Sequence, residues 1–204
     1  MRMSRVRDML MMAQQSSSLP YIELEAIEGT GTQWINSKLT PQSNITVELI
    51  AQLGSDEKFV FGSRIASKNQ QFVLTQSRLD VGSSQTNYSY THGSVATYRV
   101  AESQLYVDDE LIATNSNTIP ENNLNIYLMT CNSNNTVNSA YNNIGIWYSW
   151  VVQYGDEVVQ DLIPVILTED VDGGSAGEVG MWDKATNTFF GNSGTGEFIA
   201  HYKN

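Results

Sequence analysis

The residues best placed to do chemistry are three glutamates near the start of the chain, Glu23, Glu25 and Glu28. Their spacing can bring carboxyl groups onto one face of a strand, and two carboxyls roughly 5 Å apart support retaining glycoside hydrolysis. The same run also fits an edge strand whose solvated carboxylates discourage sheet-to-sheet pairing. We expect the three glutamates to play this second role, and we predict no catalytic residue.

Other side chains that commonly do chemistry are too few or too scattered to predict a site. His92 and His201 are the only histidines, they lack zinc-ligand spacing, and no serine lies in a G-x-S-x-G elbow. Cys131 is the only cysteine, which excludes an internal disulfide and a multi-cysteine zinc site. We expect Cys131 to be a small buried apolar residue.

Two polar stretches hold aromatic residues among amides and hydroxyls, the mixture that sugar binding uses. An exposed ring can stack on the apolar face of a sugar while amides or carboxylates bind its hydroxyls. Tyr88, Tyr90 and His92 lie in one stretch, and Tyr141 lies in the other, residues 132–143. We predict these four as candidate glycan-binding residues; alternatively, their rings belong to the core or to cross-strand pairs.

The elements that must position these groups are β-strands. From Tyr21 onward apolar and polar residues alternate, and turn residues recur about every eight to twelve positions, which is typical of a sandwich or jelly roll. The clearest strand begins at Ile144, and residues 105–112 predict a hairpin with an acidic tip at Asp108 and Asp109. The length suits one all-β domain, which we place at residues 19–204.

Residues 1–18 are predicted to form a separate attachment segment. Within residues 1–15 apolar side chains follow a 3-4-3 spacing, which predicts a short amphipathic α-helix, and three serines then form a linker. A helix of about 15 residues is marginal in water, so the alternative is a frayed tail. If the helix forms, it can bundle with identical helices, for example as a trimer, or plug into another protein through Met3, Val6, Leu10 and Ala13.

Charge limits the partners of the body. The chain has 11 basic and 22 acidic side chains, a net charge of -11. Arg2, Arg5 and Arg7 oppose only Asp8 at the N-terminus, so residues 9–204 hold the remaining eight basic and 21 acidic side chains. Such a surface repels phosphate backbones, so we expect no nucleic-acid partner. No run of residues has the pattern of a signal peptide or a membrane span, so we expect no membrane partner either.

Four stretches, taken in order, resemble one group of modules. They are residues 21–23 with 31–37, residues 61–64, residues 161–164, and residues 180–198. Together they resemble the opening strand pair, a strand end, the stretch after the central hairpin and the closing motif of concanavalin A-like or laminin G-like jelly-roll modules. Such modules occur in bacteriophage tail and other virion proteins and in some bacterial surface proteins. The resemblance implies a jelly-roll β-sandwich of two antiparallel sheets, without a transferable catalytic set.

The chain departs from the pattern of that group in its loops. Residues 28–30 lengthen the first turn, Trp34 and Asn36 stand where Tyr and Asp are usual, and residues 168–178 exceed the usual short acidic turn. These differences concern the loops and not the core.

Calcium is the one cofactor that the resemblance raises. Laminin G-like sandwiches often bind calcium with loop oxygens, and Asp170 and Asp172 offer such ligands in an acidic loop. The EF-hand spacing is absent, and acidic loops are usually solvated. We expect no cofactor, with Asp170 and Asp172 as weak calcium candidates.

The glycine-rich stretch from residue 180 to 198 is interpreted as two tight turns. Glu197 and Phe198 follow the glycines where a P-loop has Lys and Ser or Thr, and no helix follows, so a phosphate cradle is not expected. The first turn, residues 183–187, reverses one strand into residues 188–190, and the second turn, residues 191–196, reverses that strand into the last one. The aromatic residues of this stretch are expected to fill core or cross-strand positions: Trp182, Phe190 and Phe198.

Together with the predicted attachment segment, the resemblance implies a non-enzymatic structural, decoration or adhesion protein of a phage particle, held by its N-terminal segment. Its expected place is the virion, and its expected partners are other virion proteins and identical copies. The main alternative is a lectin-like module that binds glycans of the host or gut surface, with the bacterial cell surface as an alternative location. A glycoside hydrolase is a more distant alternative.

Overall fold

Strands form where the sequence alternates between apolar and polar residues. In β4 (Ile45–Leu53) every second side chain is buried, and the residues between them are partly exposed. β-branched and aromatic side chains fit such a pleated, half-buried surface.

The computed structural model describes residues 19–54, 58–65, 67, 69–137 and 144–203. These residues form strands, turns and loops, which confirms the all-β prediction, and they include no helix long and apolar enough to cross a membrane.

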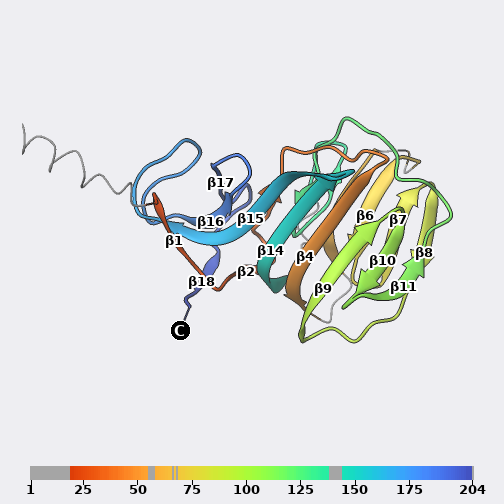
Figure 1. Cartoon of the computed structure of the whole chain (residues 1–204), viewed down its shortest axis with the longest axis horizontal. Helices are drawn as coiled ribbons and strands as arrows, with labels where there is room; N and C mark the ends of the chain where they lie inside the picture. Colours follow the sequence, from red (N-terminus) through yellow and green to blue (C-terminus); the bar gives the residue numbers. More distant parts are fainter. Residues whose placement is uncertain (1–18, 55–57, 66, 68, 138–143, 204) are drawn as a thin grey trace, which may run out of the picture.

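Eleven strands form the larger of two sheets (Figure 1). Its main path runs through β11 (Glu110–Thr114), β10 (Gln104–Val107), β9 (Val95–Ala101), β4, β14 (Ile144–Tyr154), β15 (Glu157–Leu167), β16 (Val179–Asp183) and β17 (Thr188–Phe190). Beside this path, β1 (Tyr21–Glu23) pairs with β15, and β2 (Ala26–Thr30) pairs with β14 and β18 (Ile199–His201). These pairs are antiparallel.

Seven strands form the smaller sheet. Its path runs through β3 (Ile35–Asn36), β12 (Tyr127–Leu128), β5 (Phe59–Arg64), β6 (Gln71–Thr75), β7 (Arg78–Gly82) and β8 (Ser84–Asn87), all antiparallel. The short β13 (Asn132–Ser133) adds a parallel pair to β5. The described chain therefore consists of two essentially antiparallel sheets, as predicted.

The inner faces of the two sheets meet in one core. Phe61 of β5 packs edge-on against Trp150 of β14, with ring centroids 5.1 Å apart, and lies 5.5 Å from the ring of Phe72. A polar link crosses the same core: Trp150 Nε1 donates to Gln160 Oε1 (3.0 Å), and Gln160 Nε2 donates to the Ser37 carbonyl (2.9 Å). The sheets are thus held face to face by apolar burial and by satisfied buried polar groups.

Two features predicted from the sequence are present in the larger sheet. β10 and β11 turn at Asp108 and Asp109, whose φ angles of 49° and 66° are those that a two-residue hairpin needs. β14 begins at Ile144, as predicted, and returns as β15 after Gly155, whose φ is 60°. The hairpin with the acidic tip and the long alternating strand are both confirmed.

The prediction for the last strand is wrong. β16 and β17 form the expected hairpin, but β18 pairs with β2, where Ile199 lies opposite Glu28, and not with β17. The physical reason lies in the loop before β18, because its backbone is hydrogen-bonded to residues 32–34 and is thereby led across to β2. Trp182 and Phe198 are buried, as expected.

β1, β16, β17 and β18 lie together at one end of the molecule, and β8 and β11 lie at the other end (Figure 1). A second, small cluster of buried side chains stabilises the first end: Tyr21, Val165, Leu167, Trp182 and Phe189. Leu19, the first described residue, precedes β1 by two positions, so the chain enters its body at this end.

Candidate functional site

The loop between β17 and β18 is fixed by residues 32–34. Ser193 N donates to the Trp34 carbonyl (2.8 Å), and Thr195 N donates to the Thr32 carbonyl (3.1 Å). Within the loop, Asn192 Oδ1 accepts from Gly194 N (2.8 Å), and Asn192 Nδ2 donates to the Gly196 carbonyl (2.8 Å). The Asn192 amide therefore organises a loop that would otherwise lack regular hydrogen bonds.

Gly194 explains why this loop is rich in glycine. A Cβ atom at this position would overlap the Thr32 carbonyl oxygen and would lie 2.7 Å from Trp34 Cδ1. Only glycine lets the two backbones approach so closely. Trp34 itself is half-buried and stacks on Tyr127, with ring centroids 4.4 Å apart. The glycine at position 194 thus serves a close contact between this loop and residues 32–34.

The loop between β15 and β16 lies opposite the loop between β17 and β18. Gly177 N donates to the Leu167 carbonyl (2.8 Å), and Leu167 N donates to the Glu178 carbonyl (3.0 Å), so the loop closes back on the end of β15. Glu178 Oε2 accepts from Ser175 N (3.2 Å), and Asp170 accepts from a backbone amide of the same loop. The Glu178 side chain lies against Gly191, where a Cβ atom would overlap Glu178 Oε1.

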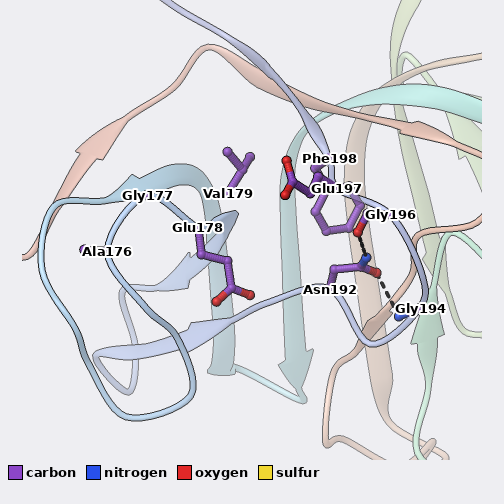
Figure 2. A pocket seen from close by; sticks show the side chains of 9 residues that line it. All are labelled: Ala176, Gly177, Glu178, Val179, Asn192, Gly194, Gly196, Glu197 and Phe198. Atoms are coloured by element: carbon purple, nitrogen blue, oxygen red, sulfur yellow. Dashed lines mark hydrogen bonds between the residues drawn. The ribbon is translucent and has the colours of Figure 1, made fainter.

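A first groove of about 490 Å³ lies between these two loops. Figure 2 shows the carboxylates of Glu178 and Glu197 and the amide of Asn192 around this space. Val179 and Phe198 supply its apolar wall, and the rest of the lining is small: Ala176, Gly177, Gly194 and Gly196.

A second groove of about 330 Å³ shares Glu178 and Asn192 with the first. We call the two together the double groove. Lys38 supplies a cation, Asp172 and Glu178 supply carboxylates, and Phe190 supplies a half-buried ring. The other polar lining residues are Asn36, Thr188, Asn192 and Ser193. Donors, acceptors and an apolar ring therefore face one open space.

Several of these groups have spare bonding capacity. Within the described part of the chain, the side chains of Lys38, Asp172 and Glu197 take part in no hydrogen bond or ion pair. Asn36 uses its Oδ1 to accept from Lys38 N (2.9 Å), which leaves its NH₂ group as a donor. Such an arrangement can bind a polar, uncharged ligand by many hydrogen bonds.

The predicted glycan residues Tyr88, Tyr90 and His92 are brought together, but at a different place. They lie between β8 and β9 and pack with Tyr98; we call these four residues the aromatic cluster. The ring centroids of Tyr90 and His92 are 5.5 Å apart, and those of His92 and Tyr98 are 6.2 Å apart. Tyr141 lies outside the described residues.

The polar atoms of the aromatic cluster bind the chain itself. The Tyr88 hydroxyl donates to the Thr75 carbonyl. His92 is hydrogen-bonded on both ring nitrogens: Nε2 lies 2.6 Å from the Gln76 carbonyl oxygen, and Nδ1 lies 3.2 Å from the Tyr98 hydroxyl. Burial raises the pKa of Tyr88 and of Tyr98 well above the usual value of 10. Only Tyr90, whose hydroxyl lies 3.5 Å from Asp108, has an exposed polar contact.

The three glutamates considered for catalysis do not share one straight strand. Glu23 ends β1, Glu25 lies at the bend that follows, and Glu28 belongs to β2. Glu23 forms an ion pair with Lys203 (2.6 Å), and Glu28 Oε2 lies within hydrogen-bonding distance of His201 Nε2 (2.9 Å). The carboxylates are therefore separated by the bend, and two of them are engaged by the C-terminal residues.

The remaining predicted residues fall into three groups. Met3, Val6, Leu10 and Ala13 lie outside the described residues. Asp170 and Asp172 lie in the loop after β15, and the described residues include no group of three or more His, Cys, Asp or Glu that could hold a metal ion. Cys131 is buried as expected, in a cluster with Phe59 and Val73, and burial raises its pKa to about 12.

Four lining residues were not predicted as site residues: Asn36, Lys38, Glu178 and Glu197. An indirect signal exists for part of the lining, because three of the four places where the chain departs from the pattern of the group that it resembles lie at the double groove. Asn36 lines it, Trp34 lies behind its glycine wall, and the long loop 168–178 forms the opposite wall.

Comparison of the chain with family models, curated proteins and solved structures finds no match.

Proposed function

We propose that the chain is a non-enzymatic structural or adhesion component of a phage particle, with a jelly-roll sandwich as its body and residues 1–18 as a helical attachment segment. The resemblance to virion modules, which extends from residue 21 to 198, supports this proposal. Two facing antiparallel sheets are the architecture that this resemblance implies.

The observation that carries the proposal is the position at which the N-terminal segment joins the body, which is one end of the long axis. The chain enters its body through β1, at the end where β16, β17 and β18 lie, and the long axis leads from there to β8 and β11 (Figure 1). A segment that leaves from one end can hold the body on a particle without covering its sheets. Three of the chain's 11 basic side chains lie in this segment, whereas the body is strongly acidic.

The partners in this proposal are other virion proteins and identical copies. A helix with the apolar stripe of residues 1–15 can bury that stripe in a homo-oligomeric bundle or in a neighbouring virion protein. The acidic body resists association with nucleic acid and with other acidic surfaces. No cofactor is part of the proposal.

Deletion of residues 1–18 tests this function. The body is expected to keep its β-rich circular dichroism spectrum but to lose both co-sedimentation with particles and its oligomeric state, because the attachment stripe is gone. Analytical sedimentation of the full and shortened chains measures both effects. An unchanged oligomer together with unchanged binding to particles would refute the attachment role.

A further inference from the structure

We infer that the double groove binds a neutral oligosaccharide. The inference deepens the adhesion role and rests on the proposed function for its biological purpose, whereas the binding itself can be measured on the isolated chain.

The space suits a short sugar chain. The two grooves measure about 490 and 330 Å³, both within the range of small-ligand sites, and they share Glu178 and Asn192. A ligand that crosses this shared boundary contacts both grooves. Consecutive sugar units can occupy consecutive hollows, whereas a compact ligand would fill only one.

The charge of the lining selects against anions. Glu178 and Glu197 line the first groove without a basic residue, and Asp172 joins Glu178 against Lys38 in the second. Phosphorylated or sialylated ligands would meet two or three carboxylates, whose repulsion is strongest where water is partly excluded. Carboxylates are good acceptors for sugar hydroxyls, so the same groups favour a neutral polyol.

The bonding groups match the faces of a sugar. Asp172, Glu178 and Glu197 can accept hydroxyl protons, and Lys38 and the Asn36 NH₂ group can donate to hydroxyl or ring oxygens. Phe190 offers a half-buried ring against which the C–H face of a sugar can pack. This combination, which the aromatic cluster was expected to supply, occurs here, and the side chains of Lys38, Asp172 and Glu197 have no partner among the described residues.

The walls of the double groove are already ordered. Asn192 and the backbone bonds to residues 32–34 hold one wall, and the pairing of Leu167 with Gly177 and Glu178 holds the other. A preformed site loses little conformational entropy on binding, so modest contacts suffice for measurable affinity.

The test probes the full chain on an array of neutral oligosaccharides of glucose, galactose and N-acetylglucosamine, with sialylated counterparts beside them. We expect binding to neutral members and weaker or no binding to the sialylated ones. Glu178→Gln, which keeps an acceptor for Ser175 N, should weaken binding about tenfold or more, because this residue lines both grooves. Asn36→Asp should also weaken binding, because it replaces the donor NH₂ by an acceptor.

The matched control is Glu169→Gln, the same change of charge in the same loop at an exposed position outside the groove lining, and binding should be unchanged. Absence of binding to every neutral oligosaccharide, a preference for sialylated ones, or full binding by both groove variants would overturn the inference. The deletion of residues 1–18 tests attachment separately, so each idea can fail without the other.

Discussion

The double groove and the aromatic cluster both bring rings and polar atoms together, but they differ in how those polar atoms are used. In the aromatic cluster, Tyr88 and His92 bind backbone carbonyls of residues 75 and 76, and Tyr98 is buried in the core. In the double groove, Glu197 and Lys38 face open space without a partner among the described residues. The presence of rings beside polar atoms therefore does not by itself show which region can bind a ligand.

The difference identifies which region can recognise a ligand. A polar group already satisfied inside the protein must break a bond before it can bind a ligand, and that cost cancels most of the gain. A group that faces water in a fixed groove exchanges one partner for another. We therefore expect changes in the aromatic cluster to affect stability and changes in the double groove to affect binding.

The largest effect is expected for Tyr98→Ala. This side chain is 1% exposed, and its loss leaves a cavity that should lower the free energy of unfolding by about 3–5 kcal/mol. The control, Tyr106→Ala on the neighbouring strand, removes a ring 4.1 Å from the Arg99 guanidinium and should cost only about 1 kcal/mol. Urea titration measures the free energy of unfolding of both variants. If Tyr98→Ala lowers it no more than the control does, the aromatic cluster does not have the structural role that we assign to it.

Gly194→Ala should affect the double groove and stability together. The new Cβ would overlap the Thr32 carbonyl, so the loop must shift, at a cost of about 1–3 kcal/mol and with weaker binding to the array. Gly93→Ala, in the loop that holds the aromatic cluster, meets no atom within 4 Å but has a φ of 110°. That variant should lose stability through backbone strain and keep full binding, so equal binding losses would contradict the distinction.

Tyr88→Phe should change the response to alkaline pH. Because burial raises the pKa of Tyr88, the unfolded chain loses this proton before the folded protein does. The contribution of Tyr88 to stability is therefore complete below pH 10 and is lost as the pH rises towards the folded pKa, by about 1.4 kcal/mol per pH unit. Unfolding titrations from pH 8 to 11 should show a steeper decline in the free energy of unfolding for the natural protein than for Tyr88→Phe; parallel declines would show that the folded protein does not raise the pKa of Tyr88.

The smallest effect is expected for removal of metal ions. The described residues lack a group of three carboxylates or histidines, so EDTA should leave the melting temperature unchanged within about 1 °C. A marked decrease that calcium reverses would assign a metal to the loop of Asp170 and Asp172 and would give the double groove a different chemistry.

The strands were the predictable part of the fold. The alternation in β14 and the Asp108–Asp109 turn follow from local periodicity and turn chemistry, and both are present. The pairing of β18 with β2 was not predictable in this way, because it depends on hydrogen bonds between residues 32–34 and a loop about 160 positions later. Local rules describe neighbours along the chain, and such a contact is formed only in the folded protein.

The site was less predictable than the fold. Tyr88, Tyr90 and His92 lie close together in the sequence, but whether the polar atoms of Tyr88 and His92 are satisfied depends on Thr75 and Gln76, which the sequence does not indicate. Glu178 is one of 22 acidic residues and becomes distinctive only through its place between two grooves. The use of each polar atom is a property of the folded chain.

The most direct test of this account is a map of ligand contacts by NMR. The neutral oligosaccharide with the strongest array signal is titrated into the labelled full chain, and backbone amide shifts are followed. We predict shifts confined to residues 32–38, 170–179 and 188–198, with none in the aromatic cluster. Shifts centred on Tyr88, Tyr90 and His92, or no shifts at saturating ligand, would contradict the assignment of ligand binding to the double groove.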